Sequence, residues 1–200
     1  MMKKAFIELL LSTGREGIEQ VIVELGKLGF FDAPASTKFH LNKVGGLLEH
    51  SMNVCTVALR LRDMMVEMNP ELGLQLSRES VIIASLLHDA CKSDIYKPKV
   101  SYRKTPDGKW EQIPGYEADY SKMPLGHGEK SVIMLQMWGL KLTLDEILAI
   151  RWHMTAWELA FQSPEQKGYL NAARAKSPLC TIIQTADGLS SNILELSSVE

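Results

Sequence analysis

The stretch "ASLLHDACKSD", residues 84–94, decides the fold because it ends an apolar run with two polar side chains, His88 and Asp89. The residues before it, from Val81 to Leu87, are almost all apolar, so the helix that they form is expected to be buried. A buried carboxylate without a partner costs on the order of several kcal/mol unless a charge or a metal compensates it. The pair therefore indicates either a turn at the end of a helix or a site that binds a cation.

Apolar residues recur at helical spacing on both sides of this stretch. The region 95–125 differs, because "KVSYRK" and "KWEQI" flank "TPDG", which is typical of a β-hairpin turn. The pattern predicts an all-α helical bundle with one β-hairpin insertion at about 95–125. Helices are expected at 6–13, 15–30, Leu47 to about Met68, Ser80 to Cys91, 128–138, 143–154 and about 178–197.

Length and composition are those of an ordinary globular domain. The chain has 200 residues, of which 46% are hydrophobic and 23% are charged, so we expect a single domain over 1–200 with N-terminal helices in 1–30 and a helical core over 40–197. The net charge of −2 argues against binding to duplex DNA. No apolar run is long enough for a membrane span. The three cysteines, an odd number, favour a reducing, cytoplasmic location, and the amphipathic start is interpreted as a helix.

Four of the five histidines fall in or at the ends of expected helices, and one aspartate, Asp187, lies among apolar residues of the last helix. Each residue alone has an ordinary structural explanation, such as a cap or a hydrogen-bonded turn. Together with Asp89 they supply six ligands, the number needed for two metal ions that share a bridging carboxylate. Imidazole and carboxylate ligands suit Mn, Fe, Ni, Co or Zn, and Mg can join such a site. The candidate ligands are His50, His88, Asp89, His127, His153 and Asp187.

The order of these residues resembles the H…HD…H…H…D signature of the HD-domain metal-dependent phosphohydrolases. Four segments carry the resemblance, and together they extend over roughly residues 40–197. They are "GGLLEHSMNV" around the first histidine, "ASLLHDACK" at the central motif, "GHGEKSVIML" at the third histidine and "TADGLSSN" at the final aspartate.

The resemblance implies a role for each ligand. One metal ion would be held by His50, His88, Asp89 and Asp187, and the bridging Asp89 would share a second ion with His127 and His153. Two such ions, roughly 3.5–4 Å apart, polarise a phosphoryl oxygen and activate a hydroxide for in-line attack. The implied activity is hydrolysis of a small phosphate mono- or diester, such as a nucleotide.

Three further residues near the motif are candidates for the site. Lys92 matches a lysine that family members often carry, and at i+3 from Asp89 it shares a helix face with the carboxylate and is expected to meet a substrate phosphate. The alternative is a lysine that complements a helix C-terminus. His40, in the loop before the long helix, is a candidate substrate contact. Cys91 stands where the family motif often has glycine, which places a thiol near the metals and suggests sensitivity to oxidation.

Other functions remain open at this stage. HD-fold di-iron oxygenases such as myo-inositol oxygenase use the same six ligands. Some bacterial 3′-to-5′ exoribonucleases have similar helices but carry a separate OB-type domain, and a small-ligand sensor that keeps its metals is another alternative. The lysines and arginines of the expected hairpin either form a solvated face or contact a phosphate or a base. Apolar surface on the first two helices suggests a homodimer.

Overall fold

The structure, a computed structural model, describes residues 1–155 and 163–196. None of the described helices is both long and apolar enough to cross a lipid bilayer. The elements are α1 (Met2–Ser12), α2 (Ile18–Lys27), α3 (Gly46–Met68), the 3₁₀ helix η1 (Pro70–Leu74), α4 (Arg78–Leu87), α5 (Lys92–Ile95), β1 (Tyr96–Lys104), β2 (Trp110–Ala118), α6 (His127–Met137), α7 (Leu144–Trp152), α8 (Pro164–Lys176), α9 (Pro178–Leu189) and the π-helix η3 (Ser190–Leu194).

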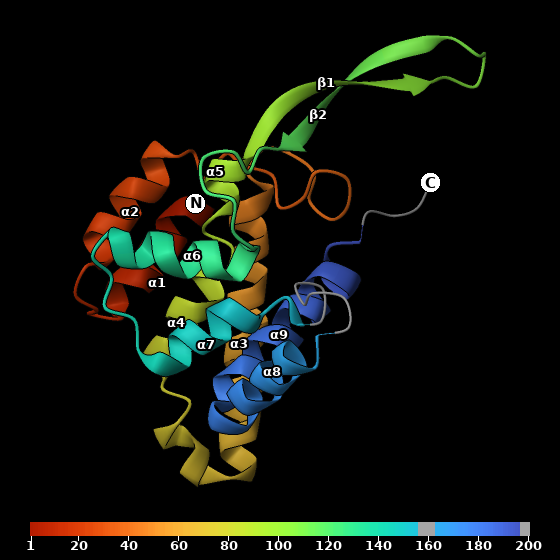
Figure 1. Cartoon of the computed structure of the whole chain (residues 1–200). Coiled ribbons are helices and arrows are strands. Elements are labelled where there is room, and N and C mark those ends of the chain that lie inside the picture. Colours follow the sequence, from red (N-terminus) through yellow and green to blue (C-terminus); the bar gives the residue numbers. More distant parts are fainter. Residues whose placement is uncertain (156–162, 197–200) are drawn as a thin grey trace.

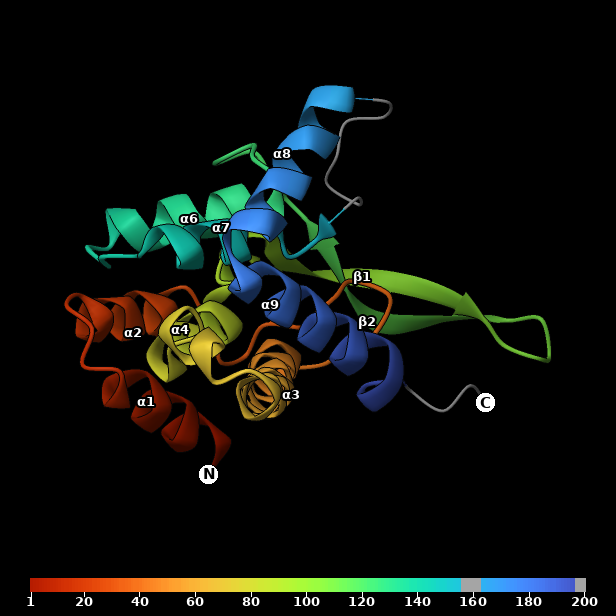
Figure 2. The ribbon, with the colours of Figure 1, turned by 90° about the horizontal axis from the view of Figure 1, so that it is seen from below.

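Helix α3 is the longest element and forms the axis of the bundle (Figure 1). Helices α4 and α9 pack against it, and α1 packs against both α3 and α4. Figure 2, which looks at α3 nearly end-on, shows α9 beside it. The core of α4 is buried on all sides from Ser80 to Leu87, as its nearly continuous apolar sequence predicts. The polar pair that follows α4 is thereby held inside the molecule.

The all-α prediction with one hairpin is confirmed, although the hairpin strands are shorter than 95–125. Strands β1 and β2 pair antiparallel from Tyr96 with Ala118 to Lys104 with Trp110. The hairpin projects away from the helical body (Figure 1). Residues 119–126 lead back to α6 without forming a helix or a strand.

Most of the lysines and arginines of the hairpin face acidic partners on its strands, its turn or its flanks. The basic residues that the sequence places here are therefore largely neutralised, and the interpretation as a solvated face is favoured. The pairs are Lys97 with Asp119, Lys99 with Glu117, Arg103 with Glu111, and Lys109 with Asp107.

Two differences from the predicted helices concern the C-terminal third. Helix α8 was not predicted, because only Leu170 and Ala173 are buried in it and no apolar stripe marks it in the sequence. The last helix does not continue to about 197. It ends as α9 at Leu189 and changes to the π-helix η3, while residue 197 lies outside the described residues.

Two glycines allow the close approaches that position the helices of the site. A Cβ atom on Gly46, at the start of α3, would collide with the carbonyl oxygen of Leu41. A Cβ atom on Gly128, in the first turn of α6, would collide with the carbonyl oxygen of Arg151 in α7. Any side chain at either position would push the helix away from its neighbour.

Candidate metal centre

Four separate parts of the bundle bring histidine and aspartate side chains to one place. His50 lies on α3, and His88 and Asp89 occupy the turn that follows α4. His153 follows the last residue of α7, and Asp187 lies on α9. Four of the five residues are at most 3% exposed. Packing of α3, α4, α7 and α9 therefore concentrates buried ligand groups at a single point.

The distances between the ligand atoms are short. His50 Nε2 lies 3.2 Å from His88 Nε2 and 3.3 Å from Asp187 Oδ1. Asp89 Oδ2 lies 3.3 Å from His88 Nε2 and 3.6 Å from His50 Nε2. Its other oxygen, Oδ1, lies 3.5 Å from His153 Nε2. Five of the six predicted ligands are thus within one cluster.

In two of the three rings, the second nitrogen is anchored away from the cluster. His88 Nδ1 donates to the Ser85 carbonyl at 2.8 Å, and His153 Nδ1 donates to the Ile150 carbonyl at 2.7 Å. A neutral imidazole that donates from Nδ1 keeps its lone pair on Nε2. For these two rings, that lone pair faces Asp89.

The residues present fit a cation. Asp89 Oδ1 and His153 Nε2 are buried and have no hydrogen-bond partner among the described residues. Burial of such atoms without a partner is costly, and a bound ion would satisfy both. The 3.2 Å between the Nε2 atoms of His50 and His88 also suits two nitrogens that are each about 2.0–2.1 Å from a metal ion.

The protonation states of two of the ligands, Asp89 and His88, suit a cation. Burial alone would raise the pKa of Asp89, but the ammonium of Lys92 and the neighbouring imidazoles together outweigh it and hold the pKa well below its usual range. Burial lowers the pKa of His88. A charged carboxylate and a neutral imidazole are the forms that coordinate metals. For His50, burial is outweighed by hydrogen bonds to Asp187 and Glu195, which raise the pKa to about 9, so a metal ion that binds this ring would displace a proton from it.

His127, the sixth predicted ligand, is the first residue of α6 and is half-buried. Its ring lies 6.4 Å from that of Tyr120. Among the described residues, the three groups of closely spaced ligand atoms do not include it. Its part in a second metal site stays a prediction.

Lys92 and His40 both line a pocket of about 230 Å³ beside the cluster. The Nζ of Lys92 lies 2.6 Å from Asp89 Oδ2, and the residue is 7% exposed. Burial alone would lower the pKa of Lys92, but the Asp89 carboxylate raises it, so the lysine stays charged. The remaining lining residues are Asp89, His153, Met154, Thr155, Gln184, Asp187, Gly188, Ser191 and Asn192.

Cys91 is fully buried, which argues against the oxidation sensitivity inferred from its place in the motif. Burial, reinforced by the charge of Asp89, raises the pKa of the thiol to about 12. Because the thiolate is the reactive form, this thiol is inert at neutral pH. The sequence puts Cys91 near the metal ligands, but only the fold shows that the thiol has no access to solvent.

The cysteines give a first testable prediction. Cys55, Cys91 and Cys180 are all buried and unpaired, and burial raises the pKa of each thiol. We expect iodoacetamide at pH 8 to leave the folded protein unlabelled and to label all three thiols after unfolding in urea. Mass spectrometry of the intact protein counts the adducts. Rapid labelling of Cys91 in the folded protein would contradict its burial.

One residue of the cluster was missed by the sequence analysis. The carboxylate of Glu195, just beyond η3, lies 2.9 Å from His50 Nδ1. The only sequence signal is an acidic residue between Leu194 and Leu196, soon after Asp187. Such a signal is too common to be recognised without the fold.

The fold and the site together define a helical protein with a buried histidine–aspartate centre. The sequence model of the HD domain matches residues 47–192, most of the chain. The chain therefore belongs to the HD-domain family of metal-dependent phosphohydrolases.

A more specific similarity links the chain to one protein of known activity. It is 30% identical over 119 residues to the dihydroneopterin 2′,3′-cyclic phosphate phosphodiesterase of Methanocaldococcus jannaschii. The match covers 60% of this chain and 43% of that protein, so the chain spans less than half of its relative. No solved structure matches the chain.

Proposed function

We propose that this protein hydrolyses a small phosphate ester at a divalent-metal centre. The observation that carries the proposal is the set of buried imidazole and carboxylate groups whose unpartnered atoms, Asp89 Oδ1 and His153 Nε2, meet beside the pocket that Lys92 lines. We also propose that residues 1–200 act as one HD-type domain. The packing of α1 against α3 and α4 supports this extension to the N-terminal helices.

The proposed ligand set is the one predicted from the sequence. His50, His88, Asp89 and Asp187 would hold one ion, and Asp89, His127 and His153 would hold a second. A divalent ion, when bound, polarises a phosphoryl oxygen and makes a water molecule a stronger nucleophile. The ion could be Mn, Fe, Ni, Co, Zn or Mg.

Lys92 and His40 would act on the substrate. The ammonium of Lys92 is fixed beside Asp89 and lines the pocket, where it would neutralise charge on a phosphate oxygen. His40 is 19% exposed through its side chain and lies at the pocket wall, where it would contact the remainder of the substrate.

The substrate class proposed first is a cyclic or linear phosphodiester attached to a small polar group, such as a nucleotide. The relative from M. jannaschii is described as acting on a 2′,3′-cyclic phosphate. The polar pocket walls, with Gln184, Ser191 and Asn192, offer hydrogen bonds to a sugar or a heterocycle. The pocket, at about 230 Å³, favours a small ester over a polymer.

The test combines metal analysis with a substrate screen. Elemental mass spectrometry is expected to find close to two divalent ions per chain in protein purified without chelator or affinity tag. The metal-loaded protein should open a 2′,3′-cyclic nucleotide, and EDTA should abolish the reaction. Absence of metal after reconstitution, together with no phosphate-ester cleavage, would overturn the proposal. Oxygen consumption with two bound irons would instead support the di-iron oxygenase.

A further inference from the structure

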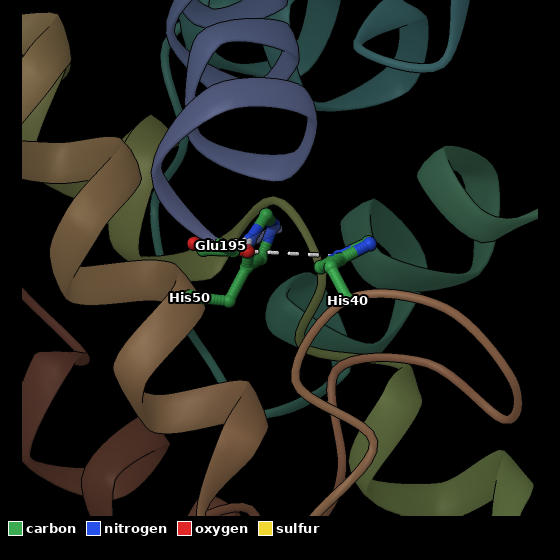
Figure 3. Close-up of side chains that lie close together, drawn as sticks. All are labelled: His40, His50 and Glu195. Atoms are coloured by element: carbon green, nitrogen blue, oxygen red, sulfur yellow. Dashed lines mark hydrogen bonds and ion pairs between the residues drawn. The ribbon is translucent and has the colours of Figure 1, made fainter. Parts of the chain in front are cut away.

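Glu195 brings a third carboxylate to the cluster from a part of the chain that the sequence signature does not include. Its side chain is 1% exposed, and it lies just beyond η3, against α3 (Figure 3). A buried carboxylate is costly unless it accepts hydrogen bonds or meets a positive charge. The partners of Glu195 therefore indicate what it does.

All the described partners of this carboxylate lie around His50. The Nδ1 of His50 is 2.9 Å from Oε2 and 3.1 Å from Oε1, so both oxygens face one ring nitrogen. Asn53, one turn further along α3, donates from Nδ2 to Oε1 at 3.0 Å and fixes the carboxylate. His40 Nε2 lies 3.9 Å from Oε2 on the opposite side, as Figure 3 shows.

His50 differs in this respect from the other two histidines of the cluster. The Nδ1 atoms of His88 and His153 donate to neutral main-chain carbonyls of their own helices. His50 alone meets a charged acceptor, which belongs to a distant segment. A carboxylate acceptor makes an imidazole a stronger ligand than a carbonyl does, and it also fixes the ring proton on Nδ1.

We propose that Glu195 is a positioning residue that holds the ring of His50 with Nδ1 protonated, so that Nε2 is available to a metal ion. The inference rests on the proposed function, because it needs the metal centre. The Nε2 atom lies within 3.3 Å of His88 Nε2 and Asp187 Oδ1, the groups that would share the ion. Without Glu195, the proton has no charged acceptor on Nδ1 and is free to occupy Nε2 instead.

An alternative role for the same atoms is to bind a further cation between His40, His50 and Glu195. The ligand atoms of these three residues lie within 4.8 Å of one another. That role would require His50 to give up both ring protons, because Nε2 already faces the main cluster. A neutral imidazole retains one proton, so a hydrogen bond to Glu195 is the favoured arrangement.

The test measures Zn²⁺ affinity by competition with a chromophoric chelator. Zn²⁺ binds imidazole and carboxylate ligands strongly, which makes it a suitable probe. Loss of the outer partner of a metal-bound histidine typically weakens metal binding by about 10–100-fold, and this is the loss expected for Glu195→Ala. Glu195→Gln keeps an acceptor oxygen but not the charge, so a smaller loss is expected.

Glu146→Gln is the matched control, because Glu146 is equally buried but pairs with Arg15 at the other end of α7. It is expected to lower the thermal midpoint of the metal-free protein and to leave Zn²⁺ affinity within about twofold. A general loss of stability would thus be separated from a specific effect on the metal.

A second readout follows the ring proton itself. In Zn²⁺-saturated protein labelled with ¹⁵N-histidine, we expect a slowly exchanging Nδ1–H of His50, which is kept in Glu195→Gln and lost in Glu195→Ala. Unchanged affinity and an unchanged proton signal in Glu195→Ala would overturn the inference. If Glu195→Ala does not fold, a loss of Zn²⁺ affinity of less than twofold in Glu195→Gln would overturn the inference.

Two other outcomes have separate meanings. Loss of one whole equivalent of Zn²⁺ in both Glu195→Ala and His40→Ala would replace the positioning role with the further cation. If the wild-type protein binds no Zn²⁺, the metal centre and the proposed function both fail. The failure of the inference is therefore distinguishable from the failure of the function on which it rests.

Discussion

Replacing Asp89 by alanine is expected to abolish hydrolysis of a confirmed substrate while leaving a folded protein. The Asp89 carboxylate lies near three histidines and Lys92 at once, and it is the proposed bridge between two ions. Loss of an outer partner of a metal ligand costs about 10–100-fold, so loss of the bridging ligand should lower kcat/KM by more than 100-fold. Steady-state kinetics with saturating metal measures the effect, and circular dichroism checks the fold.

Asp94→Asn provides a control for Asp89→Ala. Asp94 lies on α5, close to the motif, but its carboxylate binds Lys130 and Lys122 and not the cluster. Its substitution is expected to change kcat/KM by only a few-fold. Unchanged turnover in Asp89→Ala would rule out Asp89 as a catalytic ligand.

Replacing Glu146 by alanine is expected to lower the free energy of unfolding by about 3–5 kcal/mol, the cost of removing one partner of a buried ion pair. Glu146 is fully buried, and its two oxygens accept from both terminal nitrogens of Arg15, at 2.7 and 2.8 Å. One of these oxygens also accepts from the Ser80 hydroxyl at 2.7 Å. The other accepts from the main-chain N–H of Thr143, which completes the capping box of α7. The substitution would remove this acceptor from Arg15, Ser80 and Thr143, and of these donors Arg15 Nη1 would keep its bond to the Lys141 carbonyl. Urea denaturation of the metal-free protein measures the change.

Lys141 and Glu16 offer a comparison in the same region. Their salt bridge is as short, at 2.6 Å, but both side chains are 72% exposed. Glu16→Ala should therefore change stability by no more than about 1 kcal/mol, as is usual for surface pairs. Equal losses of stability in Glu16→Ala and Glu146→Ala would show that burial of the Arg15–Glu146 pair adds nothing to its contribution to stability.

The helical fold could be predicted from the sequence where apolar residues face a core. Helix α4 is apolar along nearly its whole length, and the "TPDG" turn marks the hairpin. Helix α8 could not be found in this way, because it buries only two residues and relies on its cap at Ser163 and on Pro164. The switch from α9 to η3 also has no local signal in the sequence.

The candidate ligands could be chosen by residue type and order, but their convergence could not. His50 and Glu195 are 145 positions apart, and nothing in the local sequence of either requires the other. The burial of Lys92 and Cys91 likewise depends on how the helices pack. Chemistry that depends on residue type is visible in the sequence, whereas distances and access to solvent belong to the folded chain.

The separation of the cluster residues along the chain has a consequence for folding kinetics. Contacts between α3 and the segment after α9 close a loop of nearly three quarters of the chain. Closing so long a loop costs conformational entropy, so we expect these contacts to form late in folding. A cation that binds only the completed cluster stabilises the native state and not the species that precede it. Metal would then act chiefly by slowing unfolding and much less by accelerating folding. The metal centre would therefore give the protein kinetic stability: once folded, the chain would unfold slowly as long as the ion stays bound.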